Sequence, residues 1–279
     1  MLSYRHAFHA GNFADVLKHS VLTLVLEYMT RKEKGFYYID SHSGAGMYSL
    51  VDEYAQKTAE YLNGINKIIH CDDLPQELEQ YLSIIKQLNP NETLNIYPGS
   101  PALAKQLTRR QDSSHLFELH PTDNKLLNEF CQRWHKSHVQ QSDGYQGILS
   151  LVPPPCRRAV ILIDPPYELK TDYEIAVNTI TKAYQKFATG CYILWYPVVK
   201  RQLVEKMQQL FLHSSLKNVL QVEYCQTPDS DEYGMTGTGL FIVNPPWQLQ
   251  NQLSVILPFL KEKLGSEQSH YTLKQLIEE

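Results

Sequence analysis

The chain has 279 residues, of which 43% are hydrophobic and 20% are charged, and its formal net charge is −4. This composition is that of a globular protein with one large core, or with one core and a small insertion. The negative charge excludes a surface that is basic throughout, so any contact with nucleic acid must come from local basic patches.

The five cysteines are scattered, and none belongs to a C-x-x-C pair. Such cysteines are typical of reduced, mostly buried thiols in a cytosolic protein rather than of disulfides or a zinc site. Residues 1–20 lack the apolar run of a signal peptide, and no segment approaches the roughly 20 apolar residues of a membrane span. We therefore expect a cytoplasmic protein that has no membrane partner and binds no metal.

Helical and strand patterns alternate along most of the chain. A helix is expected at 15–31. Six segments have the patterns of strands, with apolar runs in most of them: 35–40, 115–120, 159–164, 190–199, 218–225 and 239–244. A seventh, 138–144, is expected to be a weak strand. The segments around them have helical spacing: 100–111, 121–136, 145–152, 171–188, 200–217 and 252–265. Ser100 is expected to be the N-cap of its helix, with Pro101 in the first turn.

This alternation predicts an α/β fold. Strands separated by helices of this length form right-handed crossovers and a mostly parallel sheet with helices on both faces. The last two strands, 218–225 and 239–244, have no helix between them and should form an antiparallel pair at one end of the sheet.

Residues 52–94 interrupt the alternation. They have helical character, as in "QELEQYLSIIKQL", and no strong strand. Because a connection between a strand and a helix is typically about 2 to 6 residues long, a small helical insertion is the best explanation. We predict an inserted subdomain at 52–94 and a main domain made of 1–51 and 95–279.

Three successive strand ends carry residues suited to a nucleotide-like ligand, because ligands of open α/β sheets lie beyond the carboxyl ends of the strands. The first strand runs into "DSHSGAG", where Gly44 and Gly46 allow close backbone approach. The second ends at Glu118, an acidic residue placed to bind ribose hydroxyls, and the third ends at Asp143 and Gly144. Asp143 could accept a hydrogen bond from an adenine amino group, and Gly144 lets a flat ring lie against the backbone.

Each of these signals is weak alone. The first loop is not G-x-G-x-x-G and could be an ordinary turn, and Glu118 could be a solvated acid near a helix start. The acid usually follows the glycines by about 20 residues, a spacing that is restored when the insertion is left out. Together the three strand ends suit S-adenosylmethionine, which has a ribose and an adenine but no pyrophosphate.

The fourth strand runs into Asp164-Pro165-Pro166-Tyr167. A carboxylate and a backbone carbonyl aimed at a planar NH2 group would orient it and stabilise the positive charge that develops during methylation. Asp164 supplies the first and the carbonyl of Pro165 the second, while the fixed φ angles of the prolines keep the turn rigid. Tyr167 offers a flat face for an extruded base. The alternative is a merely rigid turn.

A near-copy, Asn244-Pro245-Pro246-Trp247, follows the last strand. Because that strand should be antiparallel to its neighbour, its end should lie at the opposite edge of the sheet. We interpret the near-copy as a structural turn.

The sequence resembles a known family through blocks in the same order and spacing: "MLSYRHAFHAGNFADVLKH", "DSHSGAG", "YPGSP", "ELHP", "DG", "ILIDPPYE", "WYPVV" and "NPPW". It is similar over nearly its whole length to the bacterial 23S rRNA adenine-N6 methyltransferases of the RlmJ type. The resemblance implies S-adenosylmethionine-dependent methylation of one adenine. It also implies a Rossmann-like sheet of seven strands with an antiparallel last pair, and residues 1–20 folded over the active site.

The resemblance also assigns residues. It implies cofactor contacts for Lys18 and His19 and a place near the substrate base for Tyr4. Further cofactor and catalytic positions fall on His42, Ser100, Glu118, Asp143, Gly144 and Asp164. The loop "SHSGAG" departs from the family pattern "THAGAG" but keeps His42 and both glycines. The expected partner is 23S rRNA before the subunit is fully assembled, bound by a monomer.

Alternatives remain open from the residues alone. The same chemistry would serve a DNA adenine or a protein glutamine methyltransferase, and the fold could bind a nucleotide without turnover. His6, His9 and His19 could suggest a metal site, but no carboxylate or cysteine stands with them at ligand spacing. Three basic pairs could meet phosphates or could be solvated helix ends: Arg109-Arg110, Arg157-Arg158 and Lys200-Arg201.

Overall fold

The structure is a computed structural model that describes residues 6–230 and 234–279. Within these ranges one sheet has eight strands in the order β10-β8-β9-β7-β6-β1-β4-β5, and β2 and β3 form a separate two-stranded sheet. The strands are β1 Tyr37–Asp40, β2 Met47–Ser49, β3 Ile96–Pro98, β4 Ser113–Phe117, β5 Ser137–Gln140, β6 Ala159–Ile163, β7 Cys191–Val198, β8 Val219–Cys225, β9 Gly237–Val243 and β10 His270–Ile277.

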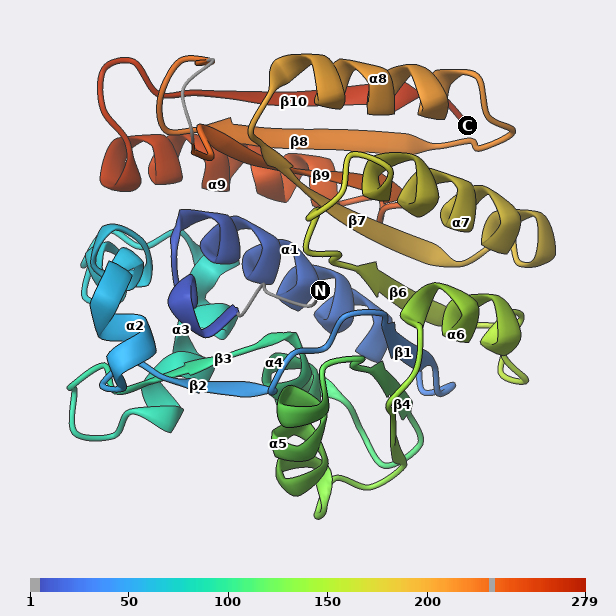
Figure 1. The fold of residues 1–279 in the computed structure, drawn as a ribbon, viewed down its shortest axis with the longest axis horizontal. Helices are drawn as coiled ribbons and strands as arrows, with labels where there is room; N and C mark the ends of the chain where they lie inside the picture. The colour runs from blue at the N-terminus through green and yellow to red at the C-terminus, as the bar shows by residue number, and fades with distance from the viewer. Residues whose placement is uncertain (1–5, 231–233) are drawn as a thin grey trace.

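Helices cover both faces of the sheet (Figure 1). The core on one face includes side chains of α1, α3, α4, α5 and α9, and the core on the other face includes side chains of α6, α7 and α8. The helices are α1 Phe13–Thr30, α2 Glu53–Thr58, α3 Gln76–Leu88, α4 Ser100–Leu107, α5 Pro121–Cys131, α6 Gly144–Leu151, α7 Asp172–Lys186, α8 Arg201–Leu212 and α9 Leu249–Leu264. Short 3-10 helices are η1 His6–Phe8, η2 Glu60–Asn63 and η3 Ile65–Lys67.

The expected α/β class is confirmed, because β5, β4, β1, β6 and β7 are parallel neighbours. The number of strands differs from the expected seven, since β10 adds an antiparallel strand beside β8. The pair β8 and β9 is antiparallel as expected, but it does not lie at the end of the sheet. Instead β9 lies between β7 and β8, and β10 forms the edge.

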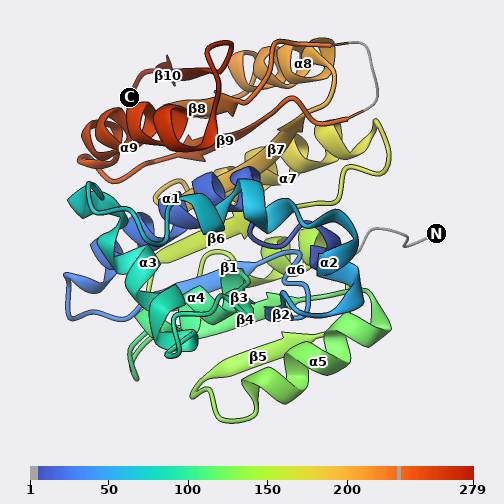
Figure 2. The ribbon, with the colours of Figure 1, turned by 90° about the vertical axis from the view of Figure 1, so that its left-hand side faces the viewer.

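The residues between β2 and β3 form α2, η2, η3 and α3 (Figure 2). Of these, α3 and η2 contact α1, and α2 contacts η1. The amide of Ile65 donates to the carbonyl of Gly11 at 2.8 Å, just before α1. Ile65, Leu78 and Tyr81 belong to the same core as the apolar face of α1. Segment 52–94 therefore packs onto the main core, and its status as a separate subdomain stays a prediction.

The parallel strands bring their carboxyl ends to one edge of the sheet. All five residues of β6 are buried, as an unbroken apolar strand between two helical layers must be. Its neighbours are β1 and β7, and β1 is followed across the sheet by β4 and β5. The segments that follow these strands are therefore placed around a common point.

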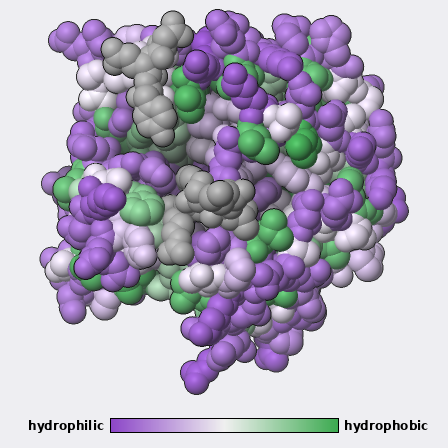
Figure 3. All heavy atoms as spheres, viewed as in Figure 1, coloured by the Kyte–Doolittle hydropathy of each residue, from purple (hydrophilic) through white to green (hydrophobic). Residues whose placement is uncertain are grey.

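On the face shown in Figure 3 the described residues are mostly hydrophilic, and the hydrophobic ones form small separate groups. Among residues 6–230 and 234–279, no helix combines the length and the apolar character needed to cross a membrane.

Candidate functional site

A cavity of about 470 Å³ opens where β1, β4, β5 and β6 end. This volume lies in the usual range for small-molecule sites, about 300–1,000 Å³. Residues predicted from the sequence supply much of its lining: Lys18, His19, His42, Gly44, Ser100, Glu118, Asp143, Gly144, Asp164 and Pro165. Gly46 and Tyr167 do not line it, and Tyr4 lies outside the described residues. Four strand ends that are distant in sequence thus meet around one space.

The loop after β1 needs a glycine at position 44. Gly44 has φ +59°, and a Cβ atom there would lie 2.1 Å from the hydroxyl oxygen of Tyr48. Its amide donates to Oε2 of Glu118 at 2.8 Å, and the amide of His120 donates to Oε1 of Glu118 at 2.7 Å. Burial raises the pKa of Glu118, although these two amide donors oppose that shift. The loop and the acidic residue of β4 are therefore held together at the cavity wall.

Asp143 and Gly144 begin α6. Asp143 is the N-cap, and its carboxylate accepts a hydrogen bond from the amide of Tyr145 at 2.8 Å. A Cβ atom at Gly144 would lie 1.9 Å from the carbonyl oxygen of Ser41. The structure thus gives a packing reason for this glycine, the close approach of α6 to the loop after β1. A contact with a flat ring stays a prediction.

The expectation that Ser100 is an N-cap is wrong. The N-cap of α4 is Gly99, and Ser100 is the first helical residue. The Ser100 hydroxyl donates to Oδ2 of Asp40 at 2.7 Å, and the hydroxyl of Tyr38 donates to the same oxygen at 2.7 Å. Burial raises the pKa of Asp40 to about 6. The Ser100 hydroxyl therefore bonds a buried carboxylate at the end of β1 instead of capping the helix.

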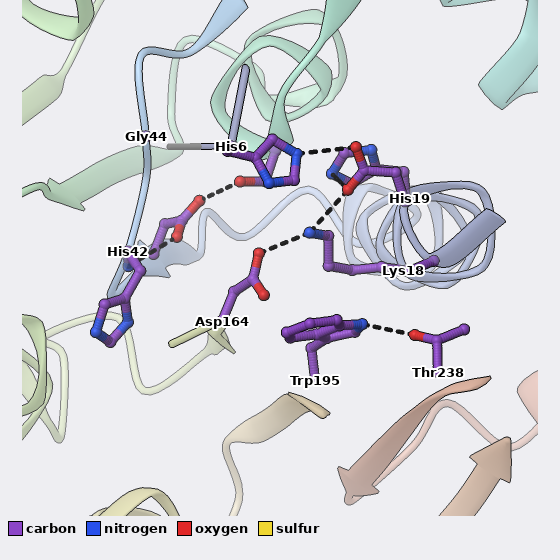
Figure 4. A network of polar contacts seen from close by, with 12 residues as sticks. His6, Lys18, His19, His42, Gly44, Asp164, Trp195 and Thr238 are labelled. Atoms are coloured by element: carbon purple, nitrogen blue, oxygen red, sulfur yellow. Dashed lines mark hydrogen bonds and ion pairs between the residues drawn. The ribbon is translucent and has the colours of Figure 1, made fainter. Parts of the chain in front are cut away.

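Asp164 reaches the cavity directly after β6 and is paired with Lys18 of α1 (Figure 4). Nζ of Lys18 lies 2.7 Å from Oδ2 of Asp164 and 3.0 Å from Oδ1 of Asp15. The Lys18 side chain is 3% exposed, so its ammonium is enclosed between two carboxylates. It also lies 5.4 Å from the ring centre of Trp195 on β7.

His19 is buried behind Lys18 in α1. Its Nδ1 atom lies 2.8 Å from the hydroxyl oxygen of Tyr97, which in turn lies 2.8 Å from that of Tyr81. Burial lowers the pKa of His19 to about 3, so the ring is neutral at physiological pH. Burial also lowers the pKa of His42, in the loop after β1, to about 4.

The N-terminal histidines have carboxylate partners that sequence spacing did not show. Nε2 of His6 lies 2.9 Å from Oδ2 of Asp15, and Nδ1 of His9 lies 2.8 Å from Oε1 of Glu60. Among residues 6–230 and 234–279, no group of three or more His, Cys, Asp or Glu side chains is arranged to hold a metal ion.

Tyr167 is held against β7. Its hydroxyl donates to the carbonyl of Trp195 at 2.5 Å, and its ring centre lies 4.4 Å from that of Tyr173. Its φ of +51° turns the chain sharply after Pro166. In this arrangement the ring packs beside the cavity rather than lining it, and its stacking role stays a prediction.

The near-copy of this motif lies at the opposite edge of the sheet, as expected. Strand β9 is antiparallel to β7, which is parallel to β6. The Asn244 side-chain amide donates to the carbonyls of Ala188 and Gly190, just before β7, at 2.8 and 2.7 Å. Trp247 is 77% exposed and is not part of the cavity lining.

In the three basic pairs, fewer positive charges are available to bind phosphates than the sequence suggested. Arg109 is paired with Asp112 at 3.0 Å, and Arg158 donates to the carbonyl of Met29 at 2.8 Å. Arg201 bridges the carboxylates of Glu223 and Asp229 at 2.8 and 2.9 Å. One arginine of each pair therefore has a structural role, which neither sequence-based interpretation included.

Sequence reasoning missed Asp15, Tyr145 and His120. Asp15 is three residues after Asn12, the N-cap of α1, and three before Lys18, a spacing that could have indicated contacts with both the helix start and the lysine. Both Tyr145 and His120 line the cavity; Tyr145 follows the recognised "DG" block, and His120 lies inside the "ELHP" block. Their roles carry no separate sequence signal.

Comparison with known proteins gives consistent matches. The family described as "Ribosomal RNA large subunit methyltransferase D, RlmJ" matches residues 33–277. The chain is 48% identical over 280 residues to Ribosomal RNA large subunit methyltransferase J of Escherichia coli (strain K12), with 100% of both chains covered. It is 45% identical to the protein of the same name from Haemophilus influenzae, covering 96% of this chain and 95% of that one.

Solved structures agree with the fold. A crystal structure of a Legionella pneumophila protein superposes with a TM-score of 0.90 at 40% identity, covering 96% of this chain and 98% of that one. A probable spermidine synthase from Corynebacterium glutamicum has a TM-score of 0.52 at 11% identity, covering 96% of this chain and 77% of that one. The second match supports only the shared α/β architecture.

Proposed function

The chain belongs to the RlmJ family of ribosomal RNA large subunit methyltransferases, and from this premise we propose that it methylates the N6 amine of one adenine in 23S rRNA. The methyl donor of this family is S-adenosylmethionine, which supplies an electrophilic methyl group when bound. The observation that carries the proposal is the carboxylate of Asp164, presented on a diproline turn in the wall of the cavity.

The cavity has polar groups suited to this donor. The Nδ1 atom of His120 and the hydroxyl of Tyr145 are buried, line the cavity and have no hydrogen-bond partner among the described residues. Buried polar atoms without partners are rare in proteins, which supports a polar ligand here. We assign donor binding to the lining residues Lys18, His19, His42, Gly44, Ser100, Glu118, Asp143, Gly144 and Asp164. The sequence adds Gly46, which follows Gly44 in the same loop but does not line the cavity.

Within this set Glu118 would bind ribose hydroxyls and Asp143 an adenine amino group. Each Glu118 oxygen already accepts one backbone amide, which fixes the carboxylate while leaving further lone pairs for hydroxyl donors.

Asp164 would act on the acceptor amine. Lys18 occupies Oδ2, and no protein group among the described residues bonds Oδ1, so Oδ1 is available to accept a hydrogen bond from N6. This contact and one to the Pro165 carbonyl would orient the planar amine and stabilise the positive charge that develops on nitrogen. Asp164, Pro165 and Tyr167 form the proposed catalytic set. Tyr4 and Tyr167 would contact the extruded base.

Radiolabelled methyl transfer tests the proposal. Wild-type protein should label rRNA and leave DNA and protein fractions unlabelled, and Asp164→Ala should lower the rate at least about 100-fold. Asn244→Ala, in the near-copy, is the matched control and should retain activity. Equal labelling by wild type and Asp164→Ala would remove Asp164 from the chemistry. Labelling of DNA or protein would favour a DNA adenine or protein glutamine methyltransferase.

We further propose that a monomer acts in the cytoplasm on 23S rRNA before the subunit is fully assembled. Naked 23S rRNA and early assembly particles should be methylated faster than mature subunits, and light scattering should give the mass of one chain. Nucleotide mapping in cells that lack the protein would identify the modified adenine. Preference for mature subunits would contradict the timing.

A further inference from the structure

Asp15 is a buried carboxylate with several donors from separate parts of the chain. Its side chain is 1% exposed. Oδ2 accepts the amide of Gly11 at 2.9 Å and lies 2.9 Å from Nε2 of His6. Oδ1 lies 3.0 Å from Nζ of Lys18 and 4.0 Å from Nε2 of His19. Both oxygens therefore have defined partners.

These partners keep the carboxylate charged. Burial alone would raise the pKa of Asp15, but the neighbouring His6 and Lys18 hold it well below its ordinary value. A charged carboxylate away from water persists only where donors surround it, as they do here.

Lys18 connects Asp15 to the proposed reaction centre. Its ammonium bonds Asp15 on one side and Asp164 on the other, at 3.0 and 2.7 Å (Figure 4). A lysine side chain is long and flexible, with about 2 kcal/mol of rotamer entropy, so one carboxylate alone fixes its ammonium poorly. Two opposed carboxylates in a buried site fix both its position and its direction.

Asp15 itself does not line the cavity, whereas Lys18, His6 and Asp164 do. Any effect of Asp15 on the reaction must therefore pass through the groups that it holds. These include Lys18 on α1 and, through His6, the segment η1 that precedes the helix.

We propose that Asp15 is a positioning residue for methyl transfer: it fixes the Lys18 ammonium against Asp164, and with it the orientation of the Asp164 carboxylate. The inference rests on the proposed function and deepens it. Without Asp15, the Lys18 ammonium can turn about Asp164, and the carboxylate loses its fixed direction toward the amine.

Asp112 provides a matched control for loss of a buried, paired aspartate. It is 1% exposed, accepts the amides of Phe36 and Arg109, and pairs with the Arg109 side chain at 3.0 Å. It precedes β4, at the edge of the sheet opposite the cavity. Asp112→Asn therefore reports the stability cost of such a change without touching the site.

The test is a double-mutant cycle on the methyl-transfer rate with saturating donor and rRNA. Asp15→Asn should lower the rate about 10- to 100-fold, the range expected when a reacting group is displaced by up to about 1 Å. Asp112→Asn should keep the rate within about threefold of wild type, with a similar fall in Tm. The double variant Asp15→Asn/Lys18→Met should be no slower than Lys18→Met by more than about threefold, because the proposal assigns the effect of Asp15 on the rate to Lys18 and none of it to His6.

Two results would overturn the inference. One is a rate for Asp15→Asn close to that of wild type. The other is a double variant whose loss equals the product of the two single losses, since independent structural damage would multiply. If wild type itself fails to methylate rRNA, the proposed function fails instead. If the wild type methylates rRNA but the two single losses multiply in the double variant, only the role of Asp15 is rejected.

Discussion

The hydroxyl of Tyr167 donates to the carbonyl of Trp195, while its ring packs on Tyr173. Tyr167→Phe removes this hydrogen bond and keeps the ring. We expect it to lower the free energy of unfolding by about 1 kcal/mol, the usual worth of one such bond. The methylation rate should stay within about threefold of wild type, because a stacking face needs no hydroxyl.

Urea unfolding and single-turnover rates separate the two roles of Tyr167. Tyr167→Ala, which removes the ring as well, should lose far more activity than Tyr167→Phe. Equal loss of rate in both variants would assign the chemistry to the hydroxyl instead of the ring.

His19 makes stability depend on pH. Burial lowers its pKa to about 3 from the ordinary 6.5, so the unfolded chain binds more protons than the folded one between these values. Its stabilising contribution is therefore complete above pH 6.5 and is lost as the pH falls toward 3. At pH 5 the loss is roughly 2 kcal/mol. Asp40, whose pKa is raised to about 6, acts in the opposite direction as the pH falls below 6.

The His19→Gln variant isolates this effect. Between pH 7 and pH 5 the wild type should lose roughly 2 kcal/mol more stability than the variant, measured by urea unfolding. The same pH dependence in both proteins would show that the pKa of His19 is the same in the folded and unfolded chains.

At the residue scale, the sequence was a good guide to which side chains surround the cavity. It was a poorer guide to the hydrogen-bond and ion-pair partners of those side chains. Asp164, Glu118 and Asp143 follow strands, so their placement depends only on sheet direction. The partners of Lys18 and His6 come from three-dimensional packing that no spacing rule gives. Ser100 was assigned a cap from its residue type, but a buried carboxylate engages its hydroxyl.

At the element scale, the turn after β9 stabilises the sheet without serving the cavity. Asn244 has φ +52° and donates two hydrogen bonds to the segment before β7. Asn244→Ala should lower the free energy of unfolding by about 2 to 4 kcal/mol, because two hydrogen bonds are lost and alanine tolerates the left-handed region less well than asparagine. Methylation by the folded variant should match wild type within about twofold.

Asn244→Gly is the matched variant, because glycine tolerates the positive φ but also lacks the side-chain amide. It should be more stable than Asn244→Ala by about 1 kcal/mol. A large loss of methylation rate in either variant, measured where both are folded, would mean that the near-copy takes part in function.

The elements that the sequence did not predict are short or lie at an edge. Strands β2 and β3 have three residues each, too few for a period of two to be seen. Strand β10 is half exposed on an edge, so its residues need no continuous apolar run. The sequence did predict a strand at each buried strand of the large sheet, because strands covered on both faces are mostly apolar.

At the scale of the whole molecule, charge is distributed unevenly. Segment 52–94 contains eight acidic residues and three lysines, which disfavours phosphate binding there. Lys170 and Lys200 are exposed and follow β6 and β7, the strands that end near the cavity. Lys170→Glu/Lys200→Glu should raise KM for rRNA about tenfold. It should also reduce the slope of log KM against log salt concentration by the amount expected for about two lost phosphate contacts.

Exposed lysines of the insertion provide the control. Lys67→Glu/Lys86→Glu makes the same change of charge, and we expect KM for rRNA to stay within about twofold of wild type. Equal effects of the two double variants would mean that charge acts through the whole molecule, or that the insertion also contacts RNA.

The overall architecture was predictable because it follows from alternation and strand length, which are local properties. The packing of segment 52–94 onto α1 was not, since it depends on apolar residues such as Ile65 and Leu78 meeting a helix far away in the chain.

Strand β10 runs antiparallel to β8, so the chain leaves the sheet at the edge away from the cavity, whereas His6 lies in the cavity wall. A fluorophore or an affinity handle joined after residue 279 would therefore keep clear of an RNA bound at the cavity. The same group attached to His6 would stand in the cavity wall and in the path of that RNA. In assays that fix this protein to a surface, the attachment should therefore be made after residue 279, beyond strand β10.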